Sequence, residues 1–249
     1  ITSLRDTGGE FDFVNSFKQK SLENPRTTPR IKIAGPLVDG NYNVYDGSSQ
    51  DYPELSIRTI NVIDLKKQVQ ILIDRKVDFL KAYEMLSPAQ FLAIAEIAKE
   101  NNLKLTGHVP LSMSVIDASN LGLNSIEHLR NIELSMSTHS DRFLRERKEI
   151  LENKRQIKGS QLRRILHEKQ RFKSIYSLDS TKIKKIVSVL AKNKTWQIPT
   201  LRLYKNYVYQ KYKDSSYISF FNMLPKNKKE EWINEIKDCL LYTSPSPRD

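Results

Sequence analysis

The segments that decide the predicted fold are Asp78-Phe-Leu-Lys-Ala-Tyr83, Leu103-Lys-Leu-Thr-Gly-His-Val-Pro110 and Ser125-Ile-Glu-His-Leu129. Each has the short apolar run of a buried β-strand. Residues 87–99 carry apolar side chains at helical spacing after a Ser-Pro start, which suits the N-cap and first position of a helix. A weaker helical pattern at about 113–121 joins the second segment to the third. This alternation predicts a parallel sheet covered by helices.

The candidate metal ligands are Lys81, His108 and His128, one at the end of each predicted strand. In parallel α/β sheets, and above all in eight-stranded barrels, catalytic residues lie at the carboxyl ends of the strands. Each residue alone has an ordinary explanation: a lysine that reaches solvent, a turn histidine, and a surface pair formed by Glu127 and His128. Their occurrence at three successive strand ends favours a metal site. Tyr83 shares the strand face of Lys81 and is a candidate for substrate contact, with a packed tyrosine as the alternative.

The composition suits one large domain or a barrel, with 249 residues and 39% hydrophobic content. The single cysteine, Cys239, leaves no intrachain disulfide, so a metal would need nitrogen and oxygen ligands. Forty-one Lys and Arg against 29 Asp and Glu give a formal charge of +12, which fits a polyanionic partner or simply a basic surface. No apolar run reaches the roughly 18 residues of a membrane span, and no signal peptide is recognisable. Because the chain starts at Ile1, a leader could lie upstream, and bacterial cytoplasm or export are both left open.

The other predicted elements alternate in the same way. Before the first segment we expect a strand, a helix, a strand, a long loop and a helix, at 1–9, 10–22, 30–36, 37–56 and 59–76. After the third segment we expect a helical insertion, an amphipathic helix, a strand and an aromatic helical segment, at about 135–176, 179–192, 195–201 and 204–236. Gly159-Ser160 is expected to divide the insertion into a helical hairpin. Arg5 and Asp6 either support the metal site or form a local ion pair.

Five motifs in this order, at 1–9, 78–83, 107–110, 125–129 and 196–201, resemble the amidohydrolase superfamily. The resemblance is strongest to its imidazolonepropionase-like metal-dependent hydrolases, which include prolidase-type dipeptidases. It implies an α/β fold in which residues 1–238 form part of a TIM-like eight-stranded barrel, covering about strands 2 to 7, with the helical insertion between strands 6 and 7. Residues 239–249 resemble a translated sequencing-adapter tail and are interpreted as non-native.

The resemblance also assigns roles to the candidate ligands. Lys81 matches the family's lysine, which carbon dioxide carboxylates so that it bridges two metals, and His108 and His128 match the histidines of the second metal. One or two divalent ions are implied, with zinc expected first. The family's first-strand His-any-His pair would lie before Ile1, and its general-base aspartate would lie downstream, so no catalytic acid or base is expected in this fragment. The implied activity of the longer protein is hydrolysis of amide or peptide C–N bonds by metal-activated water.

Two other functions remain open from the sequence. The basic insertion could bind nucleic acid or another polyanion, or the chain could be a barrel homologue without activity. Nucleic acid is disfavoured because the insertion also carries acidic residues at helical spacing from its basic ones, and a lid over the substrate fits better there. His139 and His167 are explained by a solvated helix face and are not assigned as ligands. The expected partner is a small molecule or a peptide substrate, and the oligomeric state is open.

Overall fold

The computed structural model describes residues 2–153, 157–202 and 215–243. The chain divides into two compact units, residues 1–198 and 199–249. The described part of the second unit includes the helices α10 (Ser215–Asn222) and α11 (Lys226–Thr243). Among the described residues, no helix has both the length and the apolar character that a membrane span requires. The predicted limits of a barrel at 1–238 and a foreign tail at 239–249 stay predictions, and residues 203–214 and 244–249 lie outside the described part.

The first unit is built on parallel strands. β1 (Ser3–Asp6) pairs with β2 (Arg30–Ile33) in one two-stranded sheet. The second sheet has six parallel strands in the order β4-β3-β5-β6-β7-β8. From β5 onward the spatial order follows the sequence order, as expected when each crossover adds the next strand alongside the last. These strands are β3 (Leu37–Asp39), β4 (Ser56–Arg58), β5 (Phe79–Ala82), β6 (Lys104–Gly107), β7 (Leu123–Glu127) and β8 (Trp196–Ile198).

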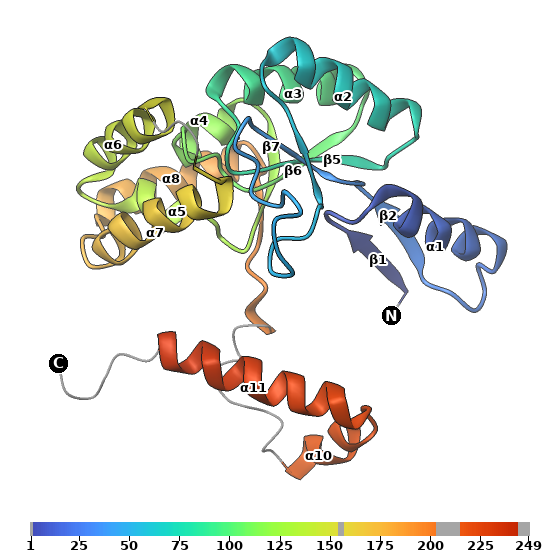
Figure 1. Cartoon of the computed structure of the whole chain (residues 1–249). Helices are drawn as coiled ribbons and strands as arrows, with labels where there is room; N and C mark the ends of the chain where they lie inside the picture. The colour runs from blue at the N-terminus through green and yellow to red at the C-terminus, as the bar shows by residue number, and fades with distance from the viewer. Residues whose placement is uncertain (1, 154–156, 203–214, 244–249) are drawn as a thin grey trace. The chain divides into compact units, whose positions relative to one another are not determined.

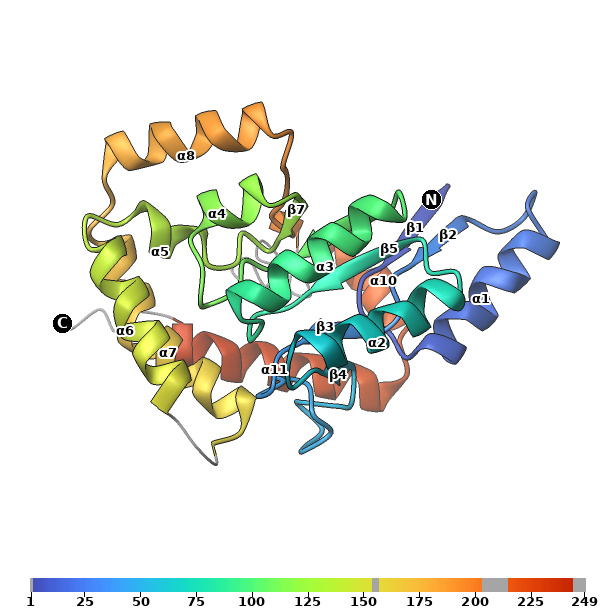
Figure 2. The same cartoon turned by 90° about the horizontal axis from the view of Figure 1, so that it is seen from above.

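Helices connect β1 to β2 and each successive pair of strands from β4 to β8, so the predicted α/β class with a parallel sheet is confirmed. The helices α2 and α3 lie side by side over the sheet (Figures 1 and 2). Between β7 and β8 the chain forms a helical region that includes the predicted hairpin, whose second helix starts at Gly159. The helices of the first unit are α1 (Phe11–Glu23), α2 (Val62–Asp74), α3 (Pro88–Glu100), α4 (Val115–Asn120), α5 (Ile132–Met136), α6 (Ser140–Asn153), α7 (Gly159–Ile175) and α8 (Ser180–Lys192).

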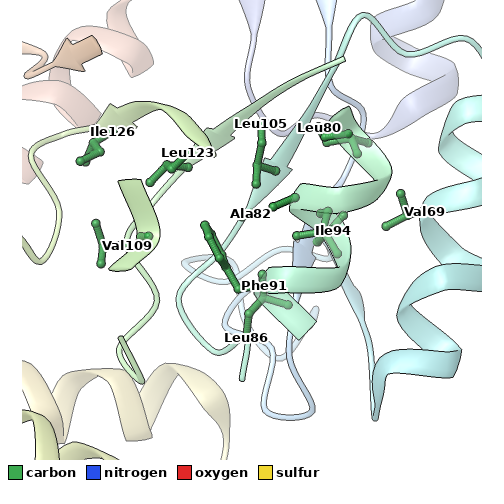
Figure 3. Packing of buried hydrophobic residues seen from close by; sticks show 14 of the residues in the cluster. Val69, Leu80, Ala82, Leu86, Phe91, Ile94, Leu105, Val109, Leu123 and Ile126 are labelled. Atoms are coloured by element: carbon green, nitrogen blue, oxygen red, sulfur yellow. The ribbon is translucent and has the colours of Figure 1, made fainter. Parts of the chain in front are cut away.

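Helix α3 shows how local sequence and packing agree. Ser87 and Gln90 form a reciprocal capping box, and Pro88 occupies the first turn, where its missing N–H costs nothing. Phe91 and Ile94 on the inner face are fully buried against strand residues such as Leu105 (Figure 3). Burial of these side chains is the main stabilising contribution to this layer, because removing apolar area from water contributes roughly 25 cal/mol per Å².

The long loop predicted at 37–56 is wrong at both ends, because β3 and β4 lie there. Gly35-Pro36 was expected to end the preceding strand. Gly35 has φ +69, so it only turns the chain, and Leu37 and Val38 continue into the core beside β5. The pairing of β3 with β4 and β5 depends on residues distant in the sequence, so it cannot be predicted from the turn residues Gly35 and Pro36. Residues 40–55 remain outside the named strands and helices.

Asp39, the last residue of β3, is a fully buried carboxylate that fixes the loop behind it. Its Oδ1 accepts hydrogen bonds from the backbone N–H of Met85 at 2.7 Å and of Gly40 at 3.0 Å. Its Oδ2 accepts one from the N–H of Val44 at 2.9 Å. The side chain therefore ties the end of β3 to the segment that follows β5.

We expect Asp39→Asn to lower the free energy of unfolding by about 2 kcal/mol, because an amide NH₂ cannot accept the N–H donors that one carboxylate oxygen accepts. Urea unfolding followed by circular dichroism measures the change. The matched control is Asp46→Asn in the same loop, where the carboxylate accepts the N–H of Ser48 at the surface. Equal stabilities of the two variants would contradict the structural role of Asp39.

Candidate metal centre

Three ligand-type side chains meet at the carboxyl ends of neighbouring strands. His108 follows β6, Glu127 ends β7, and His128 comes directly after it. One potential ligand atom from each lies within 4.8 Å of the other two. His108 and Glu127 are buried and His128 is partly exposed. Nitrogen and carboxylate oxygen donors at this spacing suit zinc and related divalent ions.

Backbone hydrogen bonds fix the two histidines. The N–H of His108 donates to the carbonyl of Ala82 at 3.2 Å, and the N–H of His128 donates to the carbonyl of Ile198 at 2.8 Å. Gly107 has φ +137, and a Cβ there would lie 2.0 Å from the Ala82 carbonyl oxygen, so no other residue fits before His108. His128 itself has φ +58, a left-handed conformation that is uncommon outside glycine and is often found at functional sites.

Lys81 and Glu127 form a buried ion pair beside the histidines. The Glu127 carboxylate also accepts hydrogen bonds from Arg5 and from the Thr106 hydroxyl, both at 3.1 Å. Burial alone would raise the pKa of Glu127, but Lys81 and Arg5 hold it below its usual value. Burial lowers the pKa of Lys81, although Glu127 acts in the opposite direction. The interpretation of Glu127 and His128 as a surface pair is therefore wrong for Glu127, because β7 ends with that side chain facing the Lys81 strand.

The second carboxylate near the centre is Glu84, which is fully buried. Its Oε1 lies 2.7 Å from His108 Nδ1. Three further nitrogens approach the same carboxylate: Arg163 Nε at 3.2 Å, His167 Nε2 at 3.4 Å and Arg130 Nε at 3.6 Å. Burial alone would raise the pKa of Glu84, but the charge of Arg163, the His108 hydrogen bond and the nearby His167 bring it well below its usual range.

The solvated position expected for His167 is wrong. Its side chain is 16% exposed and faces Glu84, because His167 and Arg163 lie four residues apart on the inner face of α7. His139, by contrast, is exposed and its ring packs on Phe143. Asp6 accepts the backbone N–H of Gly9 at 3.0 Å. Arg5 of β1 pairs with Glu127 of β7, which belongs to the other sheet.

His108 has the charge state and the free ring nitrogen of a metal ligand. Burial lowers the pKa of His108 to about 4, even though the neighbouring Glu84 carboxylate favours the charged form. The imidazole is therefore neutral, which is the form that binds metals. Its Nε2 is buried, and within the described part of the chain it has no hydrogen-bond partner. A buried acceptor without a partner is costly unless something else occupies it, so His108 fits a metal ligand.

A cavity of about 230 Å³ adjoins this centre. Its walls bring together Lys81, His108, His128 and Tyr83, the four residues that the sequence had singled out. The Tyr83 ring is buried and packs against the His108 ring with centroids 4.5 Å apart. Arg130 and Arg163 also line the cavity, and neither was predicted. Proximity of the four predicted residues is observed; their roles stay predictions.

Comparison with known proteins bears on the fold. Neither the family models nor the curated proteins that were compared match this sequence. Among solved structures, a Xaa-Pro dipeptidase with methionine bound in its active site matches over 96% of this chain and 51% of that protein, with a TM-score of 0.53 and 14% identity. The fold is thus similar to part of that dipeptidase, and this chain spans about half its length.

Two other structures show weaker similarity. A bottromycin amidohydrolase matches over 52% of this chain and 27% of that protein, with 22% identity and a TM-score of 0.43. An ochratoxinase from A. niger matches over 77% of this chain and 47% of that protein, with 13% identity and a TM-score of 0.43. At these values we base the fold comparison on the dipeptidase alone.

Proposed function

We propose that this chain is the metal-binding part of a hydrolase that cleaves C–N bonds in small amides or peptides. The observation that carries the proposal is the buried Nε2 of His108, which has no hydrogen-bond partner among the described residues. His108 belongs to a cluster beside a cavity, in which one ligand atom of each of His108, Glu127 and His128 lies within 4.8 Å of the other two. The fold similarity to a dipeptidase and the position at the strand ends support it. We propose zinc as the metal, because it suits histidine and carboxylate ligands.

The ligands in this proposal are His108, His128 and Glu127. A bound divalent ion would acidify a water molecule and polarise the substrate carbonyl. The apolar side chains of the cavity wall exclude bulk water, and Tyr83 contacts the substrate. Arg130 and Arg163, which also line the cavity, orient polar groups of the substrate.

We further propose that Lys81 is carboxylated when the site is loaded. Its lowered pKa makes the neutral amine accessible, which is the form that reacts with carbon dioxide. The Nζ lone pair forms a bond to the carbon, one C=O electron pair moves onto oxygen, and the nitrogen releases a proton. This proton, and the one that the ammonium loses before it reacts, pass to solvent water, so that Glu127 stays ionised as a metal ligand. The lysine changes from a cation into an anionic ligand, and its ion pair with Glu127 is replaced.

The test is zinc binding by the 249-residue chain, followed by a hydrolysis assay on the longer protein that contains it. We expect zinc to co-purify or to bind after dialysis, as measured by elemental analysis. We also expect a carbamate signal in ¹³C NMR of the folded chain loaded with zinc and ¹³C-bicarbonate, and no such signal in Lys81→Met. For the longer protein, we expect dipeptide hydrolysis that a zinc chelator abolishes. A chain that binds no divalent ion would refute the proposal.

A further inference from the structure

We propose that Glu84 is a positioning residue, which holds His108 with its proton on Nδ1 and with the Nε2 lone pair directed to the metal site. The expected effect on metal binding rests on the proposed function. The expected tautomer of His108 rests only on the geometry of the metal-free chain. No sequence motif pointed to Glu84, which follows the Lys81 strand by two residues and had no assigned role.

The first step is the hydrogen bond itself. An ionised carboxylate only accepts hydrogen bonds, so the 2.7 Å contact of Glu84 Oε1 with His108 Nδ1 requires the proton on Nδ1. An imidazole that binds a metal through Nε2 carries its single N–H on Nδ1, the nitrogen that faces Glu84. Nε2 is the buried nitrogen that lacks a partner in the described structure. The carboxylate thus selects the tautomer, as carboxylates behind metal-binding histidines do.

The second step is the rigidity of the pair. The Tyr83 ring packs on the His108 ring, and the His108 backbone N–H is bonded to Ala82. The Glu84 carbonyl accepts the N–H of Leu111 at 2.9 Å, which ties the segment after β5 to the segment after β6. Because these contacts already restrict the Glu84 and His108 side chains, the hydrogen bond between them costs little further rotational freedom. It can therefore fix the orientation of the His108 ring.

The third step links the centre to the insertion. Arg163 and His167 of α7 approach Glu84 Oε2, the carboxylate oxygen that does not bond His108. The positive charges of Arg130 and Arg163 beside the buried Glu84 favour its ionised form. An ionised carboxylate is a stronger acceptor than a neutral carboxyl group for the Nδ1–H of His108. Docking of α7 therefore supports the ligand geometry at a metal site to which it contributes no ligand of its own.

A purely structural role for Glu84 would be charge neutralisation of Arg130 and Arg163. The two roles differ in the expected tautomer of His108, because charge neutralisation of the arginines would not place the His108 proton on Nδ1. The test uses Glu84→Met, which removes the acceptor, and Glu84→Gln, which keeps an acceptor oxygen without the charge. The matched control is Glu133→Met, which removes the partner of another α7 arginine, Arg171 at 3.1 Å, away from His108.

Two measurements are made on the full chain. In the zinc-free chain, ¹⁵N NMR of the histidine rings should show the Nδ1–H tautomer at His108 in the wild type and in Glu133→Met, and loss of that tautomer in Glu84→Met. In a competition with a fluorescent chelator, zinc affinity should fall by about 10–100-fold in Glu84→Met, and less in Glu84→Gln. Circular dichroism confirms that each variant is folded.

Either of two results would overturn the inference: an unchanged His108 tautomer in Glu84→Met, or a zinc affinity equal to that of Glu133→Met. If Glu84→Met does not fold, Glu84→Gln gives the same comparison at smaller amplitude. If the wild-type chain binds no zinc, the proposed function fails, while the tautomer in the zinc-free chain still decides the role of Glu84.

Discussion

Glu127→Gln is expected to lower the free energy of unfolding by about 3–5 kcal/mol, the cost of removing one partner from a buried ion pair. The Lys81 side chain is only 4% exposed, and its ammonium would be left without its carboxylate. Glutamine keeps one acceptor oxygen, so either Lys81 or the pair Arg5 and Thr106, which donate to the other oxygen, would also lose its acceptor. The loss should become smaller at high pH, because the pKa of Lys81 is already lowered by burial and the unpaired amine can deprotonate.

Urea unfolding of the purified chain, followed by circular dichroism, measures this effect. The control is Glu168→Gln in the exposed Arg164–Glu168 pair of α7, where we expect a change below about 0.5 kcal/mol. The double variant Lys81→Met with Glu127→Leu should regain most of the lost stability, because two apolar side chains leave no buried charge. A Glu127→Gln loss no larger than the control would show that water reaches this pair.

Glu127 is expected to make the wild-type chain less stable as the pH falls. Its pKa is held below the usual value in the folded chain, because Lys81 and Arg5 outweigh burial. The unfolded chain therefore takes up the proton first as the pH falls. The stability from this group is present above the ordinary glutamate pKa and is lost as the pH falls through the lowered folded value.

Much of the fold could be predicted because its signals are local. The strands at β5, β6 and β7 are apolar runs, and α3 carries its start signal in Ser87 and Pro88. The strands β3 and β4 could not be predicted in the same way. Each is three residues long, and their pairing depends on partners distant in the sequence. Gly35-Pro36 also reads as an end, although the chain continues into the sheet.

Of the candidate site, the sequence analysis named the residues at the strand ends but not the residues packed behind them. Lys81, His108 and His128 stand at strand ends, and that position can be read from a sequence. The layer behind them could not be read. Helix α7 is charged on several sides, so its sequence does not say which face packs inward. Only the tertiary fold brings Arg163 and His167 of that helix to Glu84, and only the pairing of β7 with β6 turns Glu127 inward.

His108→Ala is expected to lower the zinc affinity of this chain by more than about 100-fold, because it removes a ligand, and loss of a supporting residue alone costs about 10–100-fold. His108 Nε2 is a buried nitrogen without a hydrogen-bond partner in the described residues, and its removal leaves only Glu127 and His128 of the three candidate ligands. The matched control is His139→Ala, which removes an exposed histidine that packs on Phe143. Zinc affinity is measured by competition with a fluorescent chelator at fixed pH, since ligand protonation changes it. If both variants bind zinc like the wild type, the bound ion lies elsewhere on the chain; if only His108→Ala loses it, the strand-end centre is the metal site and its neutral imidazole is a ligand.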